Sequence, residues 1–344
     1  MSNVTRPLAK DETLQALVTA LQALGLGNVG NMAALVTTDK TSLVAAVNEL
    51  KRKNDTEDGR LDELEAHLYH NIPRIVPKDI TSYVTDGTIW KRLNGTDGFD
   101  LYEDLYVGDY FQMSRAISAH NQDAQYQATG TRYVTIAGID WYMRNGDSAA
   151  ISYHHLVMVP GKGFDASEAQ HFGRSRMNSS NVTTGGYVSS EMNETTIGAI
   201  VSAGSTASDA TINQQLYAEF STHLKTTREN LSNAVEAERY NRLGLASGAA
   251  SGRAWFDCQA VLMSEIEVYG SIVYSSSGYD TGNACRQLPL FAHSKIAQNN
   301  RSAYYWLKDV ASAAYFCLCY SIGNARYHGA SNASIYVRPR FILA

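Results

Sequence analysis

The sequence is poor in charged residues. Charged side chains make up 18% of the 344 residues, against roughly 25% in an ordinary soluble protein. The net charge of −5 provides no basic field that would attract nucleic acid or an anionic membrane. No run of about 18 apolar residues is present, so we expect no membrane insertion. Residues 1–10 also lack the apolar stretch of a secretory signal.

Cysteine is scarce as well. Cys258, Cys285, Cys317 and Cys319 are too few for a disulfide framework in a chain of this length, and their spacing fits no zinc pattern. We therefore expect synthesis in a reducing cytoplasm, with no metal or other cofactor. A protein made there can still act outside the cell if lysis releases it.

The sequence is rich in tyrosine, with 21 residues, and contains many Ser, Asn and Gly. This composition is typical of adaptable protein-binding surfaces such as antibody loops. The alternative is a β-rich domain that uses Tyr in its strands, where aromatic residues are favoured. The length of 344 residues predicts two or three structural units.

Helical periodicity dominates the N-terminal part. Residues 8–24 have apolar side chains at helical spacing and are followed by Gly25. Residues 37–72 then contain a seam with alternating steps of four and three, formed by Leu43, Val47, Leu50, Asn54, Glu57, Leu61, Leu64 and Leu68. This seam predicts a coiled coil, which needs partner chains to bury its apolar stripe. The alternative is two short helices with a loop at 54–58.

The pattern changes after Pro73 and Pro77, which end the helical region. From there on, short apolar runs alternate with Gly- and Ser-rich turns, as in a mixed α+β fold with mainly antiparallel sheet. We expect strands at 81–93, 102–111, 133–139 and 155–160 and several short ones near the C-terminus, and helices at 211–226 and 262–269.

Several phrases resemble known families. Residues 37–50 (TTDKTSLVAAVNEL) are similar to a segment of phage tail and baseplate proteins that leads into a trimeric coiled coil. Middle segments such as 134–140 and 228–235 resemble tail-associated proteins from phages of gut Firmicutes. The close, from Tyr305 to Phe341, resembles the C-terminal module of C-type-lectin-like domains. That group includes the formylglycine-generating fold and the variable proteins of diversity-generating retroelements. Tyr336 stands where this motif commonly has Gly.

The resemblance implies a domain order and a function. It suggests a virion-attachment segment at 1–36, a coiled coil at 37–72 and a lectin-like receptor-binding domain at 73–344, with an inserted or shoulder region at 80–200. The implied protein is a homotrimeric phage tail-tip or fibre adhesin, made in the bacterial cytoplasm. Its partners would be a host cell-surface protein or glycan and other tail proteins. The alternative is a structural baseplate component without receptor contact.

Residues 312–336 are the expected binding segment. They contain no Lys, Glu, Gln, Met or Trp, the five residues that codons ending in a pyrimidine cannot encode. This absence fits the diversification that the retroelement resemblance implies. The expected exposed positions are Tyr315, Cys317, Cys319, Tyr320, Ile322, Arg326, His328, Asn332, Ile335 and Tyr336. The alternative is that half of them point into the core, because side chains alternate along a strand.

Three residue pairs with possible chemistry are expected to be structural, so we predict no enzyme. Alternate strand positions make Cys317 and Cys319 a poor disulfide pair. The adjacent histidines His154 and His155 diverge on a strand and do not share a metal. Glu265 and Glu267 resemble the two carboxylates of a glycosidase only in residue type. Glycoside hydrolysis needs a defined distance between the two carboxylates across a cleft, and sequence spacing does not show that distance.

Overall fold

The computed structural model describes residues 48–49, 52, 68–119, 130–145, 151–203, 205, 210–233, 252–275, 286–292 and 303–344. The chain divides into two compact units, residues 1–65 and 66–344. The helix expected at 8–24 and most of the coiled coil expected at 37–72 lie outside the described residues. In the second unit the fold is mixed α+β with mainly antiparallel sheet, as predicted.

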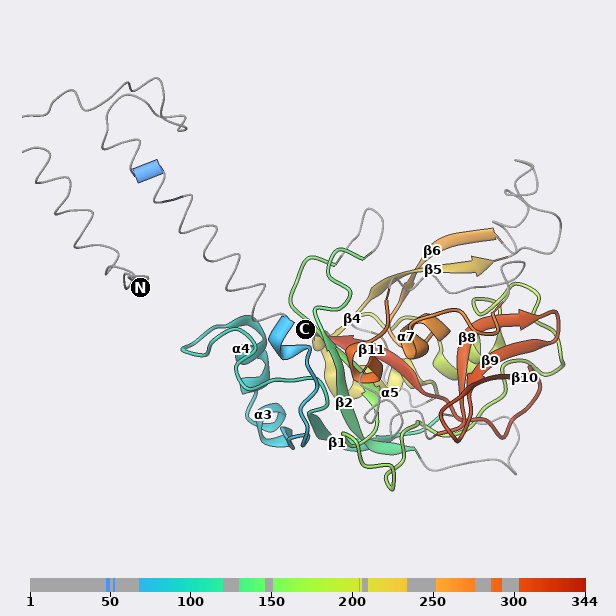
Figure 1. The fold of residues 1–344 in the computed structure, drawn as a ribbon, viewed down its shortest axis with the longest axis horizontal. Coiled ribbons are helices and arrows are strands. Elements are labelled where there is room, and N and C mark those ends of the chain that lie inside the picture. The colour runs from blue at the N-terminus through green and yellow to red at the C-terminus, as the bar shows by residue number, and fades with distance from the viewer. Residues whose placement is uncertain are drawn as a thin grey trace, which may run out of the picture. The chain divides into compact units, whose positions relative to one another are not determined.

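A six-stranded antiparallel sheet lies at the centre of the second unit (Figure 1). Its strand order is β1-β2-β3-β11-β4, and β7 also pairs with β11. Two of these strands, β2 and β3, confirm the strands expected at 133–139 and 155–160. The six strands are β1 (Tyr110–Ile117), β2 (Thr131–Ile139), β3 (Leu156–Pro160), β4 (Leu224–Lys225), β7 (Val261–Leu262) and β11 (Pro339–Leu343).

The last strand of the chain lies in the middle of this sheet. All five residues of β11 are buried, and Phe341 pairs with Met158 of β3. β3 is buried throughout because its sequence, Leu-Val-Met-Val-Pro, has no polar side chain. A continuous apolar run of this kind suits a strand covered on both faces. The C-terminus is therefore anchored in the core.

Two smaller antiparallel sheets complete the strands of the described residues. One has the order β10-β9-β8, with β10 at its edge, and the other is a ribbon of two strands. The three-stranded sheet confirms the short strands expected near the C-terminus. The strands are β8 (Tyr305–Ser312), β9 (Tyr315–Cys319), β10 (Ala325–Gly329), β5 (Thr227–Asn233) and β6 (Gly252–Cys258).

The strand expected at 81–93 is wrong, because these residues form two short helices. They are α3 (Thr81–Thr85) and α4 (Thr88–Asn94). An aspartate precedes each helix, and its carboxylate accepts the N–H of the first helical threonine. The distances are 3.0 Å for Asp79 and 2.9 Å for Asp86. These local side-chain bonds start a turn where the β-branched composition indicated a strand.

The strand expected at 102–111 begins only at Tyr110. Before it the chain turns through Tyr102 and Asp104, whose φ angles of 58° and 56° are left-handed. An extended strand does not adopt such angles. The Asp104 carboxylate is ion-paired with Lys78, a residue outside the turn, and this ion pair stabilises the turn. The alternating apolar residues of this segment are buried from a series of turns and not from a strand.

Helix α5 (Ile212–Phe220) confirms the helix expected at 211–226 but ends earlier. Thr211 caps it in a capping box with Gln214. At Ser221 the φ of 50° takes the chain out of the helix. A short 3₁₀ turn, η4 (Ser221–His223), then leads into β4. Leu224 therefore belongs to the sheet, although its spacing was helical.

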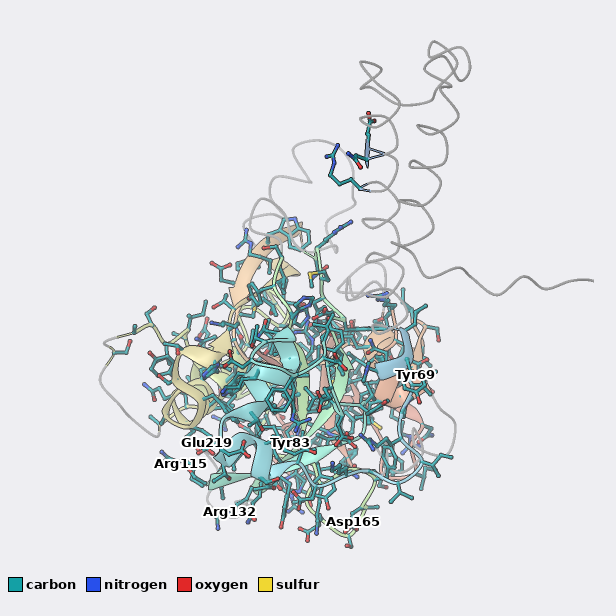
Figure 2. All side chains as sticks on the ribbon, turned by 90° about the vertical axis from the view of Figure 1, so that its left-hand side faces the viewer. Tyr69, Tyr83, Arg115, Arg132, Asp165 and Glu219 are labelled. Carbon is teal, nitrogen blue, oxygen red and sulfur yellow. The ribbon has the colours of Figure 1, made fainter. Side chains whose placement is uncertain are left out.

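Side chains of α5 and β2 meet on β1. Glu219 accepts the backbone N–H of Ser114 at 2.6 Å and its hydroxyl at 2.5 Å, and Arg132 of β2 donates to the Ser114 carbonyl. Figure 2 shows Glu219 and Arg132 with Arg115 on this side of the molecule. These bonds fasten the helix to the edge of the central sheet.

Helix α7 (Glu265–Tyr269) is shorter than the helix expected at 262–269, since Leu262 belongs to β7. Ser264 and Glu267 form its capping box, and the left-handed Gly270 (φ 76°) ends it. The described second unit also contains α8 (Pro289–Ala292) and the π-helix η3 (Met192–Ile197).

Candidate functional site

Three tyrosines from separate segments form an exposed cluster, which we call the tyrosine face. Tyr315 opens β9, Tyr327 lies in β10, and Tyr274 comes from the loop after α7. Ring centroids lie 5.4 Å apart between Tyr315 and Tyr327, and 5.2 Å apart between Tyr274 and Tyr327. The three residues remain 43%, 42% and 48% exposed in chain order. The Tyr274 and Tyr327 rings pack in a T-shape and the Tyr315 and Tyr327 rings in a tilted arrangement, so the rings hold one another while leaving surface for a partner.

The register of the small sheet brings two of these rings together. Cys317 lies opposite Tyr327, and Gly329 lies opposite Tyr315. The two tyrosines are thus diagonal neighbours on one side of the β9–β10 hairpin, within reach for aromatic side chains. Among the described strands β10 pairs with β9 alone, and its three central residues, Arg326, Tyr327 and His328, are all exposed.

The other side of the hairpin gathers four of the predicted site residues. The Arg326 guanidinium lies 4.6 Å above the ring centre of Tyr320. The His328 ring nitrogen Nε2 lies 3.1 Å from the side-chain amide of Asn332. Ile322, which is 75% exposed, stands at the turn between the two strands. Arg326 and His328 are exposed and Tyr320 and Asn332 are partly exposed, so these contacts form a second surface on the other side of the hairpin from the tyrosine face.

Three predicted site residues are buried, so the expectation that they are exposed is wrong. Cys317, Cys319 and Ile335 are all 0% exposed. Cys317 and Cys319 alternate with Phe316 and Leu318, yet both sides of β9 are covered here. Only Tyr315, the first residue of β9, remains exposed, and the other four residues of this strand are covered. These three positions belong to the core.

Tyr336 is half-buried and serves as a link between segments. Its ring is stacked 3.7 Å from the His171 ring, and its hydroxyl accepts a 2.7 Å hydrogen bond from Arg174. Burial is the main cause that lowers the pKa of His171 to about 4, with help from Arg338 and Arg174. A cavity of about 300 Å³ lies beside this stack. The neutral histidine packs here as an aromatic surface.

The sequence did not single out the loop that supplies Tyr274. Ile272, Val273 and Tyr274 are 49%, 48% and 43% exposed. Their signal in the sequence is an apolar triplet between Gly-Ser and Ser-Ser-Ser. An exposed run of this kind stands out only once the loop is known to face solvent. Tyr327 also lay outside the ten expected positions.

Glu267 belongs to a buried ionic cluster and not to a catalytic cleft. Its carboxylate lies 2.6 Å from Arg340 and 3.6 Å from Lys308, and Glu229 pairs with both cations. Tyr142 donates a further hydrogen bond to Glu267. Burial would raise the pKa of Glu267, but Arg340 and Lys308 lower it to about 2. Two carboxylates and two cations balance each other within the core.

The adjacent histidines hold the turn at Asp140. His155 is buried, with Nδ1 3.0 Å from the Tyr153 carbonyl oxygen and Nε2 accepting the Tyr142 N–H at 3.2 Å. His154 turns to the Asp140 carboxylate, 2.8 Å away. Asp140 has a left-handed φ of 51°, and its side chain also accepts the His155 N–H at 2.7 Å. Both rings thus stabilise a strained turn.

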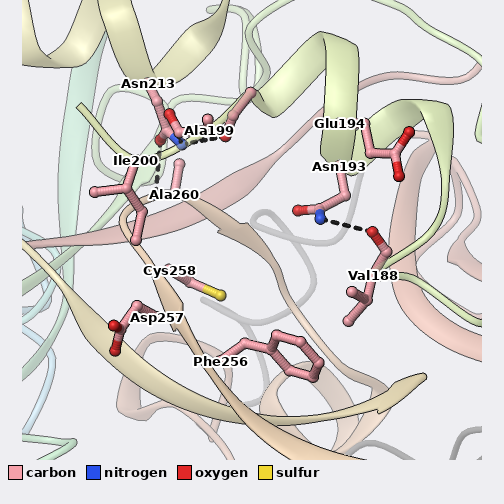
Figure 3. A pocket seen from close by; sticks show the side chains of 11 residues that line it. Val188, Asn193, Glu194, Ala199, Ile200, Asn213, Phe256, Asp257, Cys258 and Ala260 are labelled. Atoms are coloured by element: carbon pink, nitrogen blue, oxygen red, sulfur yellow. Dashed lines mark hydrogen bonds between the residues drawn. The ribbon is translucent and has the colours of Figure 1, made fainter. Parts of the chain in front are cut away.

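A second cavity, of about 310 Å³, lies between η3 and the end of β6 (Figure 3). The side-chain amide of Asn213 donates to the Gly198 carbonyl at 2.7 Å, and that of Asn193 donates to the Val188 carbonyl at 2.9 Å. Burial, with Glu229 nearby, raises the pKa of the Cys258 thiol to about 12. The lining amides therefore stabilise the fold, and the thiol stays protonated.

Metal-ligand geometry and membrane-spanning length are both missing from the part of the chain that the structure describes. There, three or more His, Cys, Asp or Glu side chains do not come together in a way that could hold a metal ion. No helix of that part is long and apolar enough to cross a membrane. No protein-family model, curated protein or solved structure matches the chain.

Proposed function

We propose that this chain is a phage or prophage tail-tip or fibre adhesin that binds a host cell-surface protein through the tyrosine face. The observation that carries the proposal is the exposed contact of Tyr274, Tyr315 and Tyr327. Tyrosine offers a large contact area at low entropic cost, since only two side-chain torsions are fixed on binding. The assignment to phage tail proteins and the expected location in the virion rest on the sequence resemblance around residue 40.

The C-type-lectin-like assignment is part of this proposal. A small antiparallel sheet, β8 to β10, displays side chains near the end of the chain. The segment Val337–Pro339 then leads into β11, in the middle of the central sheet. In the C-type-lectin-like domains that the close of the sequence resembles, the final strands likewise form a small sheet that displays side chains before the chain returns to the core. This order supports variation of exposed side chains on a fixed backbone.

The composition of the face favours a protein over a glycan. Beside the tyrosines stand the aliphatic side chains of Ile272 and Val273, about half exposed. Aliphatic groups gain most by burial against other apolar groups. Residues 312–336 contain one Arg and no Asp, Glu or Lys, so the segment is slightly positive in a chain of net charge −5. A neutral or acidic protein surface therefore fits best.

The test is capture on whole cells from a panel of gut Firmicutes, the hosts that the resemblance suggests. Cells of the strains that retain the purified protein are treated with proteinase or with periodate before the protein is added. Periodate destroys vicinal diols of glycans. We expect proteinase to abolish capture and periodate to leave it intact. The opposite pattern makes the receptor a glycan, and failure to bind any strain overturns the adhesin proposal.

A structural tail component is the second candidate, and one observation favours it. Apolar side chains of Leu68, Tyr69, Ile72, Ile75 and Val76 are 60% to 92% exposed at the start of the second unit. Such an apolar stretch usually marks contact with another chain. It supports the proposed homotrimer as well as contact with tail neighbours. If no strain is bound, this surface and not the tyrosine face becomes the main functional region.

A further inference from the structure

A buried carboxylate lies beneath the exposed loop that follows α7. Glu265 is 0% exposed. Its carboxylate accepts the backbone N–H groups of Val273 at 3.0 Å, Tyr274 at 3.0 Å and Ser275 at 2.8 Å. The Tyr274 N–H lies 3.0 Å from both carboxylate oxygens. Hydrogen bonds to an ionised acceptor are about twice as strong as neutral ones.

The same residue is tied to the small sheet that bears the other two tyrosines. The backbone N–H of Glu265 donates to the Asp309 carboxylate on β8. From Asp309 the connection runs through Glu265 to the loop, and from Tyr274 to Tyr327 on β10 by ring contact. The loop is thus joined to the sheet in two places. In the interior the carboxylates of Asp309 and Glu265 connect them, and at the surface the rings of Tyr274 and Tyr327 are in contact.

The hydrogen bonds to Glu265 explain why apolar side chains of the loop remain exposed. Ile272, Val273 and Tyr274 are about half exposed, although apolar side chains in a Ser-rich loop would gain by turning inward. The carboxylate holds the backbone of the loop by three N–H groups, so the side chains are left outside. Residues 273–275 therefore have little freedom to lose when a partner covers them, which is the advantage of a preorganised surface.

We propose that Glu265 is the positioning residue of the tyrosine face. It does not touch the partner. It acts through the backbone of Val273, Tyr274 and Ser275, and fixes the Tyr274 ring against Tyr327. The inference rests on the proposed function for its effect on binding, but the ordering of the loop by Glu265 is a property of the free protein.

The first experiment needs no receptor. In Glu265→Gln, one acceptor oxygen becomes an NH₂ donor that faces N–H groups of the loop. Amide hydrogen exchange should become faster by on the order of tenfold at Val273, Tyr274 and Ser275. Exchange in β11 should stay unchanged, which shows that the core is intact. Equal loop exchange in the wild type and the variant overturns the proposal.

The second experiment is a double-mutant cycle on cells of a strain that the wild-type protein binds. Glu265→Gln alone should weaken capture by about tenfold, the scale of one important interface residue. In a Tyr274→Ser background it should have little further effect, because the ring that it positions is gone. In a Tyr315→Ser background its effect should persist. Coupling of this kind is expected only between groups that act together.

The cycle separates positioning from folding. If Glu265 were needed only for stability, its effect would be the same in both backgrounds, and that result would overturn the proposal. If Glu265→Gln does not fold, Glu265→Asp retains the buried charge and should show a smaller loss with the same coupling to Tyr274. If wild-type protein binds no strain, the proposed function fails, while the exchange experiment still decides the role of Glu265.

Discussion

Helix α7 contributes one buried carboxylate to the ionic cluster in the core and another beneath the tyrosine face, and the two carboxylates use their charge in different ways. Glu267 neutralises Arg340 and Lys308, so its charge is met by other side-chain charges. Glu265, two residues earlier, is met by backbone N–H groups of a surface loop. Both carboxylates are 0% exposed. One therefore fixes side chains within the core, and the other fixes a backbone whose side chains remain about half exposed.

This difference explains which positions can vary. In the ionic cluster every side chain is defined by its partners, and a change at one leaves a buried charge unmatched. On the tyrosine face the backbone is held by groups that do not depend on the displayed side chains. A surface built in this way can accept new side chains without losing its shape. The comparison predicts large effects on stability in the core and large effects on binding at the face.

The largest loss of stability is expected from Arg340→Met. The change leaves Glu229 and Glu267 with Lys308 as their only cation within the cluster. Breaking a buried ion pair in this way costs about 3–5 kcal/mol. Urea unfolding measures it. Arg326→Ala is the matched control, an exposed arginine over an aromatic ring, and should change stability by less than about 0.5 kcal/mol. A small effect of Arg340→Met would show that the cluster is not tightly coupled.

A pH effect of intermediate size is expected from His171. Its folded pKa is lowered from 6.5 to about 4, first by burial. The unfolded chain therefore binds a proton at His171 between pH 6.5 and pH 4, where the folded chain does not. The contribution of His171 to the free energy of unfolding is therefore fully present above pH 6.5, and it is lost as the pH falls from 6.5 to 4.

Thermal unfolding across that range measures the effect. His171→Asn, which can still accept the 3.0 Å bond from the Gly173 N–H, should show a flatter dependence on pH. An equally steep decline in the variant would assign the pH effect to other groups.

A smaller effect separates the buried and exposed halves of the predicted binding segment. Cys317→Tyr inserts a ring into a closed core and should cost about 1–3 kcal/mol. Ile322→Tyr at the exposed turn should cost less than about 0.5 kcal/mol. Unfolding curves of both variants give the comparison. If Cys317 accepts Tyr as easily as Ile322, diversification of the whole segment becomes compatible with the fold.

The sequence predicted those features that depend on local pattern. The strands at 133–139 and 155–160 follow from their apolar and β-branched residues, and the α5 helix follows from its four-residue spacing. Local side-chain bonds were harder to see, so the turn at Asp79 and the helix that follows were taken for a strand. The end of α5 at Ser221 depends on a left-handed residue that spacing does not reveal.

The candidate site was predictable only in part, because it joins distant segments. Short strands near the C-terminus were expected, but the alternation of residues was not enough to show that Cys317 and Cys319 are covered. Tyr274 comes from a loop after α7, and its position depends on Glu265 and the packing of α7 against β8. A single sequence does not show such long-range contacts. Glu265 itself was considered only as a catalytic carboxylate, and its burial gives it a different role.

The central claim is that the tyrosine face makes the contact with the host cell. The most direct test is whole-cell capture by the variant Tyr274→Ser, Tyr315→Ser, Tyr327→Ser. Its control is Tyr153→Ser, which changes a tyrosine that is 38% exposed outside the face. Loss of several central aromatic contacts should reduce affinity by on the order of 100-fold, while the control binds like the wild type. Unchanged capture by the folded triple variant would contradict the account.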